Sequence, residues 1–188
     1  MKNEYSRKQF LRMFPFGFRE ILHENGGEPE IKKEVSVFRP PGAVEDEKHF
    51  TKLCERCKKC GAACPHDVIY YPGIKAGTLE NTPLLNPVKK PCRWCRDMPC
   101  IKACKSGALK RAAFNKIAKI GRAYIDLELC STSNGILCDI CVSACPSTIK
   151  AVRLNTNRQP EISVEKCTGC GLCAYYCDAT PGAITIIK

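Results

Sequence analysis

The amino-acid sequence predicts an α+β fold made of two small modules with little regular secondary structure. Three observations lead to this prediction. The 188 residues include 16 cysteines but only 7 phenylalanines and 1 tryptophan, so the aromatic core must be modest. The cysteines fall into four quartets along the chain. Short β-type runs at residues 68–71, 152–154 and 183–187 follow three of these quartets, so a cysteine loop, a turn of helix and a strand recur.

The quartets differ in the regularity of their spacing. The first and fourth read CxxCxxCxxxC, whereas the second has four residues between its middle cysteines and the third has seven between its first two. A turn at Asn134-Gly135 is needed to bring Cys130 to its partners, and a three-iron cluster or another completing group is the alternative. The quartets are Cys54, Cys57, Cys60 and Cys64; Cys92, Cys95, Cys100 and Cys104; Cys130, Cys138, Cys141 and Cys145; and Cys167, Cys170, Cys173 and Cys177.

This spacing is typical of iron–sulfur ligation. Three cysteines at intervals of three residues can wrap one cubane, and the next cysteine usually ligates the neighbouring cluster of a two-cluster module. Disulfides would need an oxidising compartment, and structural zinc sites use separated cysteine pairs. The sequence therefore predicts four [4Fe–4S] clusters held by all 16 cysteines, in two ferredoxin-like dicluster modules whose core is dominated by the clusters.

Spacing alone leaves two ways of pairing the quartets. They can pair in tandem, first with second and third with fourth, or they can nest, with the first and fourth enclosing the second and third. The regular spacing of the first and fourth quartets favours nesting. The nested ligand sets are Cys54, Cys57, Cys60 and Cys177; Cys167, Cys170, Cys173 and Cys64; Cys92, Cys95, Cys100 and Cys145; and Cys130, Cys138, Cys141 and Cys104.

The first 45 residues contain no cysteine and are predicted to form an arm and linker. The four-cluster domain then spans residues 46–188, with an outer module of 46–80 and 155–188 and an inner module of 81–154. Ser6 to Arg12 is similar to a twin-arginine export signal, but the apolar segment that should follow is short and broken. We expect a cytoplasmic protein, with a periplasmic one as the alternative. Basic and aromatic residues at 7–22 suit peripheral contact with a membrane subunit at the inner face.

The positive charge of the chain is unevenly distributed. The formal net charge is +11, and residues 51–125 carry 16 basic groups against 4 acidic ones. Four clusters at about −2 each would offset most of this charge, which argues against nucleic-acid binding. We expect an acidic redox partner to dock on residues 51–125. An alanine-rich basic stretch at 105–119 predicts a helix within this region.

Several motifs resemble those of the NapG/MauM ferredoxin-type proteins. They include Arg39-Pro-Pro-Gly-Ala43, the ending Cys64-Pro-His-Asp67 of the first quartet, and the loop Cys167-Thr-Gly-Cys-Gly171. The likeness covers residues 38–188. It implies a four-cluster electron carrier of quinol-linked reductase systems or of methylamine oxidation. Related electron-transfer subunits share the nested arrangement, so the resemblance also implies nesting of the quartets in this chain.

These observations predict an electron-transfer protein rather than an enzyme. The chain would relay single electrons between a donor, quinol-linked if the resemblance holds, and a reductase or other oxidoreductase. An assembly factor for a cytoplasmic metalloenzyme is the alternative function. Deleting the arm separates the two hypotheses, because a carrier should keep its reduction potentials without it.

Overall fold

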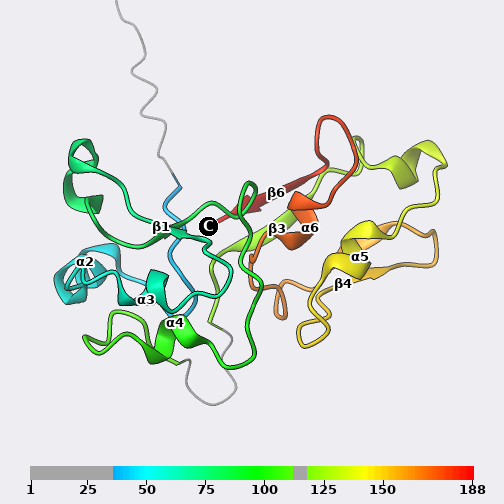
Figure 1. Ribbon diagram of the computed structural model, residues 1–188. Helices are drawn as coiled ribbons and strands as arrows, with labels where there is room; N and C mark the ends of the chain where they lie inside the picture. Colours follow the sequence, from blue (N-terminus) through cyan, green and yellow to red (C-terminus); the bar gives the residue numbers. More distant parts are fainter. Residues whose placement is uncertain (1–35, 112–117) are drawn as a thin grey trace, which may run out of the picture. The chain divides into compact units, whose positions relative to one another are not determined.

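The computed structural model of the chain describes residues 36–111 and 118–188 (Figure 1). The helices within these residues are short, and none of them is long and apolar enough to cross a membrane. The predicted α+β fold with little regular secondary structure is confirmed. The helices are α2 (Glu47–Leu53), α3 (Lys59–Ala62), α4 (Pro99–Lys102), α5 (Ile140–Ala144) and α6 (Leu172–Tyr175), with 3-10 turns η1 (Ile74–Leu79) and η2 (Ser131–Asn134).

The strands form three separate antiparallel pairs. The predicted runs at 68–71, 152–154 and 183–187 are confirmed as β1, β4 and β6. In Figure 1, β3 and β6 lie side by side, with Tyr124 opposite Thr185. The pairs are β1 (Ile69–Tyr70) with β2 (Leu84–Leu85), β3 (Arg122–Ile125) with β6 (Ile184–Ile187), and β4 (Val152–Leu154) with β5 (Pro160–Ile162).

Buried apolar residues gather in two small cores, and cysteines belong to both. The first core contains Phe50, which is fully buried, together with Leu85 and Ile101. The second contains Val152 and Ile184. Each core is too small to exclude water from a large volume by itself, so the groups that the cysteines bind must supply much of the interior.

The loop of the fourth quartet packs directly against backbone that lies 45 or more residues earlier in the chain. A Cβ atom on Gly171, which has a φ of +93°, would lie 2.0 Å from the Pro87 carbonyl oxygen. The Cys92 N–H donates a hydrogen bond of 3.0 Å to the Cys170 carbonyl, and the Ile120 N–H donates one of 2.8 Å to the Thr168 carbonyl. Glycine is therefore required at 171 both for its left-handed backbone and for this close approach.

Residues 38–44 fall within the predicted arm, but they pack into the compact unit. The Val44 N–H donates to the Ala108 carbonyl at 3.1 Å, and Ala43 forms a bridge with Leu109. The twin-arginine-like stretch and the proposed membrane contact at 7–22 lie outside the described residues. The cytoplasmic location stays a prediction.

Arg39 anchors this entry segment although it is almost completely buried. Its guanidinium pairs with the Glu47 carboxylate, donates to Thr82 Oγ1 at 2.7 Å and to the Pro83 carbonyl at 2.9 Å, and lies 4.3 Å from the centre of the Phe50 ring. One side chain thus joins the segment before α2 to the backbone before β2. Burial of a charge is tolerated here because every contact is a hydrogen bond, an ion pair or a cation–π contact.

Replacing Arg39 with alanine is expected to lower the free energy of unfolding by about 2–4 kcal/mol, since it removes charged hydrogen bonds from a buried site. Thermal unfolding of anaerobically purified protein, followed by circular dichroism, measures the effect. Arg153→Ala is the matched control, because the Arg153–Glu161 pair is 3.2 Å long but its arginine side chain is 80% exposed. Arg153→Ala should lower the free energy of unfolding by less than about 1 kcal/mol. Equal losses in the two variants would contradict this role for Arg39.

The predicted helix at 105–119 is wrong over residues 105–111, which are not helical. Gly107 has a φ of +75°, and the Leu109 N–H donates to Cys104 Sγ at 3.3 Å. Binding of the backbone to a cysteine sulfur overrides the helical propensity of the alanines. Residues 112–117 lie outside the described part of the chain.

Candidate iron–sulfur centres

Four cavities of similar size each have four cysteines in their walls. Each cavity has a volume of ≈ 20 Å³. Every cavity takes three cysteines from one quartet and the last cysteine of another. We name them site A (Cys54, Cys57, Cys60 and Cys104), site B (Cys64, Cys92, Cys95 and Cys100), site C (Cys145, Cys167, Cys170 and Cys173) and site D (Cys130, Cys138, Cys141 and Cys177).

The predicted nested grouping of the cysteines is wrong, because the cavities follow the tandem arrangement. The nested sets placed Cys177 with the first quartet, Cys64 with the fourth, Cys145 with the second and Cys104 with the third. In the structure, Cys177 lines site D, Cys64 lines site B, Cys145 lines site C and Cys104 lines site A. The first quartet thus exchanges its last cysteine with the second, and the third with the fourth. An outer module that joins residues 46–80 to 155–188 does not fit this grouping.

Short helices explain the tandem exchange. Helix α3 contains Cys60 of site A and ends two residues before Cys64 of site B. Helix α4 contains Cys100 of site B and ends two residues before Cys104 of site A. Because α3 and α4 contact each other, the two sites share both helices. Helices α5 and α6 are in contact in the same way between sites C and D. Each helix therefore directs one cysteine of its quartet into the neighbouring site.

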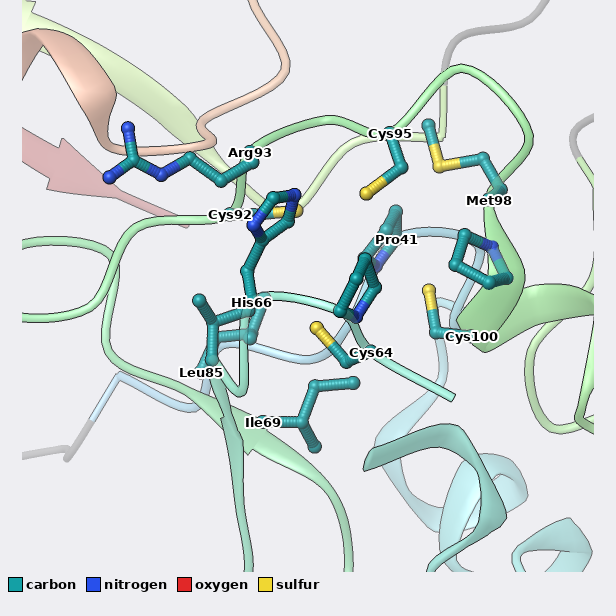
Figure 2. Close-up of a pocket in the computed structure, with 13 residues that line it drawn as sticks. Pro41, Cys64, His66, Ile69, Leu85, Cys92, Arg93, Cys95, Met98 and Cys100 are labelled. Atoms are coloured by element: carbon teal, nitrogen blue, oxygen red, sulfur yellow. The ribbon is translucent and has the colours of Figure 1, made fainter. Parts of the chain in front are cut away.

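Figure 2 shows how the chain encloses site B. The labelled Cys64, Cys92, Cys95 and Cys100 surround a common space, and apolar side chains such as Pro41 and Met98 complete the wall. His66 also lines this cavity, beside Cys64. Within residues 36–111 and 118–188, no three His, Cys, Asp or Glu side chains lie close enough to hold a single metal ion. The cysteines of each site line the wall of a cavity instead.

The cysteine loops of sites A, B and C repeat one backbone conformation. In each loop, the residue before the second cysteine and the residue two before the third have positive φ. Such angles are uncommon for residues other than glycine and cost roughly 1 kcal/mol each, so their recurrence indicates a shared requirement. The loops are therefore shaped alike for the same kind of cofactor. The residues are Arg56 and Lys58, Trp94 and Met98, and Gly169 and Gly171.

Site D is built differently from the other three. Asp139, which follows Cys138, has a φ of −135°, and the chain returns from Cys130 through Gly135 at a φ of +77°. The predicted turn at Asn134-Gly135 thus brings Cys130 into the cavity with its three partners. The irregular spacing of the third quartet is accommodated by η2 rather than by the standard loop.

Backbone N–H groups donate to cysteine sulfurs in sites A and C. The Leu109 N–H approaches Cys104 Sγ at 3.3 Å in site A, and the Ala151 N–H approaches Cys145 Sγ at 3.2 Å in site C. The Ala123 N–H lies 3.4 Å from Cys167 Sγ. Such donors favour the thiolate over the thiol and raise the reduction potential of a bound cluster.

Burial opposes this effect on the free thiols. Loss of water raises the pKa of Cys92 and of Cys173 to about 12, and the pKa of Cys100 and of Cys141 to about 11. At neutral pH these thiols keep their protons unless a positive ion compensates the thiolate charge. Iron ions supply that charge, so cofactor binding must release protons.

Two polar groups at these sites were not predicted from the sequence. Thr168 lines site C, and its Oγ1 is buried without a hydrogen-bond partner in the part of the chain that the structure describes. A buried hydroxyl of this kind is stabilised by an acceptor such as a cluster sulfide. In site A, the Tyr71 hydroxyl lies 3.5 Å from Cys60 Sγ and accepts a hydrogen bond of 2.9 Å from the Gly61 N–H. The sequence presented Tyr71 only as part of a strand.

Comparison with known proteins agrees with this geometry. Residues 122–178 match a family model described as a 4Fe-4S dicluster domain. That range contains all eight cysteines of sites C and D, which supports pairing of the third quartet with the fourth.

Curated relatives match most of the chain. The ferredoxin-type protein NapG of Escherichia coli (strain K12) is 35% identical, over 99% of this chain and 87% of that protein. NapG of Haemophilus influenzae is 35% identical over 84% of this chain, which spans only 61% of that relative. The methylamine utilization ferredoxin-type protein MauM of Methylobacillus flagellatus is 35% identical, over 81% of this chain and 69% of that protein. No solved structure matches. The predicted resemblance is confirmed, and the chain belongs to the NapG and MauM family of ferredoxin-type iron–sulfur proteins.

Proposed function

We propose that sites A, B, C and D each hold one [4Fe–4S] cluster and that the chain relays single electrons along them. The observation that carries this proposal is the set of four similar cavities, each walled by four cysteines from two quartets. Membership of a ferredoxin-type family supports an electron-transfer role. A bound cluster supplies reversible one-electron chemistry, while the protein's thiolates, N–H donors and apolar walls hold it and set its potential.

The route that we propose runs from A through B and C to D. Sites A and B share α3 and α4, and sites C and D share α5 and α6. Between B and C, the hydrogen bond from the Cys92 N–H to the Cys170 carbonyl joins a cysteine of one site to a cysteine of the other over 3.0 Å. Neighbouring sites thus contact each other through ligand-bearing segments along the whole route.

The proposed partners are redox proteins at the two ends of this route. Site A is bordered by Arg56 and Lys58, and Cys57 is exposed there, so an acidic partner can approach the first site closely. We propose no catalytic step for the chain itself. We also propose that the donor is quinol-linked and that the acceptor is a reductase. These two parts of the proposal rest on the family resemblance.

Metal analysis tests the proposal directly. Anaerobically purified protein should contain about 16 iron atoms and as many acid-labile sulfides per chain, at about four of each per cluster. Electron paramagnetic resonance during a redox titration should then show one-electron reduction of cubane clusters. Protein stripped of iron by a chelator is the control and should give no signal. Stoichiometric zinc in place of iron would overturn the proposal.

A further inference from the structure

The two ends of the proposed route have opposite charge. The segments 52–64 and 102–111, which supply the ligands of site A, contain eight lysines and arginines and one acidic residue. The segments 123–149 and 167–187, which supply those of site D, contain no lysine or arginine at all, although the chain as a whole has a formal charge of +11. The acidic residues of these two segments are Asp126, Glu128, Asp139 and Asp178.

Exposed apolar side chains flank two of the cysteines of site D. Leu127 and Leu129 precede Cys130 and are 40% and 39% exposed. Ile136 and Leu137 precede Cys138 and are 59% and 74% exposed. Because Cys130 and Cys138 line the same cavity, both apolar pairs lie within three residues of a cysteine of site D.

The backbone around these apolar pairs is ordered by its own hydrogen bonds. The Cys130 N–H donates to the Leu127 carbonyl at 3.2 Å, and the Ile136 N–H donates to the Ser131 carbonyl at 3.1 Å. Helix η2 lies between them. The apolar side chains are therefore presented by a compact loop and not by an extended strand. A clustered apolar surface that is surrounded by charged residues is typical of a protein interface.

We propose that residues 126–139 are the docking surface for a redox partner whose contact face is apolar at its centre and bears lysine or arginine at its rim. The inference rests on the proposed function and adds the chemistry of the partner at site D. A cluster held by the cysteines of site D would supply one electron to the partner's redox centre, without transfer of a bond or a proton. Glu128 and Asp139 are exposed and would pair with the basic rim.

Charge decides between the candidate occupants of this surface. An anionic membrane, or an acidic protein of the kind expected at site A, would be repelled by the acidic residues. A second copy of the chain would bring the same acidic groups together across a symmetric contact, which is unfavourable. A basic partner gains from both the apolar centre and the acidic rim, so the two ends of the route select unlike partners.

Electron-transfer kinetics with two soluble probes test the inference. Full-length protein carrying its clusters is reduced with dithionite and mixed anaerobically with cytochrome c, a basic acceptor, or with flavodoxin, an acidic one. At low ionic strength, Glu128→Lys and Ile136→Ser should each lower the second-order rate constant for cytochrome c about three- to tenfold and leave that for flavodoxin unchanged. Lys59→Glu, near site A, should lower the rate constant for flavodoxin and leave that for cytochrome c unchanged.

Two controls keep the outcomes distinct. Glu165→Lys makes the same change in net charge at an exposed position outside the walls of site D, and it should affect neither rate by more than about a factor of two. Iron content is measured for every variant. Wild-type protein without iron would overturn the proposed function itself. Unchanged cytochrome c rates in Glu128→Lys and Ile136→Ser, with full iron content, would overturn only the docking surface. Wild-type dimers that Ile136→Ser dissociates in sedimentation would also overturn it, because a second copy would then occupy the face.

Discussion

Replacing Cys54 and Cys104 together with alanine is expected to remove one cluster, whereas replacing Cys54 and Cys177 together is expected to remove two. Cys54 and Cys104 line the same cavity, so the second substitution damages a site that the first has already destroyed. Cys177 lines site D. The iron content should therefore fall by about four atoms in the first double variant and by about eight in the second.

The control for this experiment is the double variant of Cys138 and Cys177, which share site D and should also lose about four iron atoms. Circular dichroism identifies any variant that fails to fold. The nested grouping predicts the reverse result for the two double variants that contain the Cys54 substitution. A loss of about four iron atoms from the Cys54 and Cys177 variant, and of about eight from the Cys54 and Cys104 variant, would show that the clusters are nested.

Gly171→Ala is expected to lower the melting temperature by about 5–15 °C, corresponding to about 2–5 kcal/mol. Its added Cβ would lie 2.0 Å from the Pro87 carbonyl oxygen and 2.6 Å from the carbonyl carbon, and backbone atoms cannot rotate away. The loop must then move, which lengthens the hydrogen bond between Cys92 and Cys170. Thermal unfolding under anaerobic conditions measures the loss, and slower electron exchange between sites B and C should accompany it.

Gly135→Ala separates the clash from the backbone strain. Gly135 has the same left-handed backbone as Gly171, with a φ of +77° and a ψ of 5°, but a Cβ there would have no atom within 4 Å. The control therefore keeps the conformational penalty, about 1–2 kcal/mol, and lacks the steric one. If the two variants melted at the same temperature, the close approach of the fourth cysteine loop to Pro87 would not matter for stability.

The sequence predicts the cluster ligands better than it predicts how they are grouped. Spacing such as that of Cys167, Cys170 and Cys173 depends on local loop geometry, which a few neighbouring residues determine. Grouping depends on which helices pack together, and α3 against α4 is a tertiary contact between residues some 40 positions apart. Regular spacing in the first and fourth quartets therefore carried no information about their pairing.

Buried polar contacts were the other feature that sequence reasoning could not supply. Arg39 appeared only as part of a motif before the first quartet, and its partners Thr82 and Pro83 lie more than 40 residues away. Tyr71 reaches Cys60 only because β1 turns back beside α3.

The tandem grouping has a consequence for how the protein is made. All eight cysteines of sites A and B lie at or before residue 104. Site C remains incomplete until residue 173 has been synthesised, and site D until residue 177. Two complete ligand sets thus emerge from the ribosome well before the other two, in an order that follows the chain. A nested grouping would have left Cys54, Cys57 and Cys60 waiting for a fourth ligand until translation was almost finished, as exposed thiols open to oxidation.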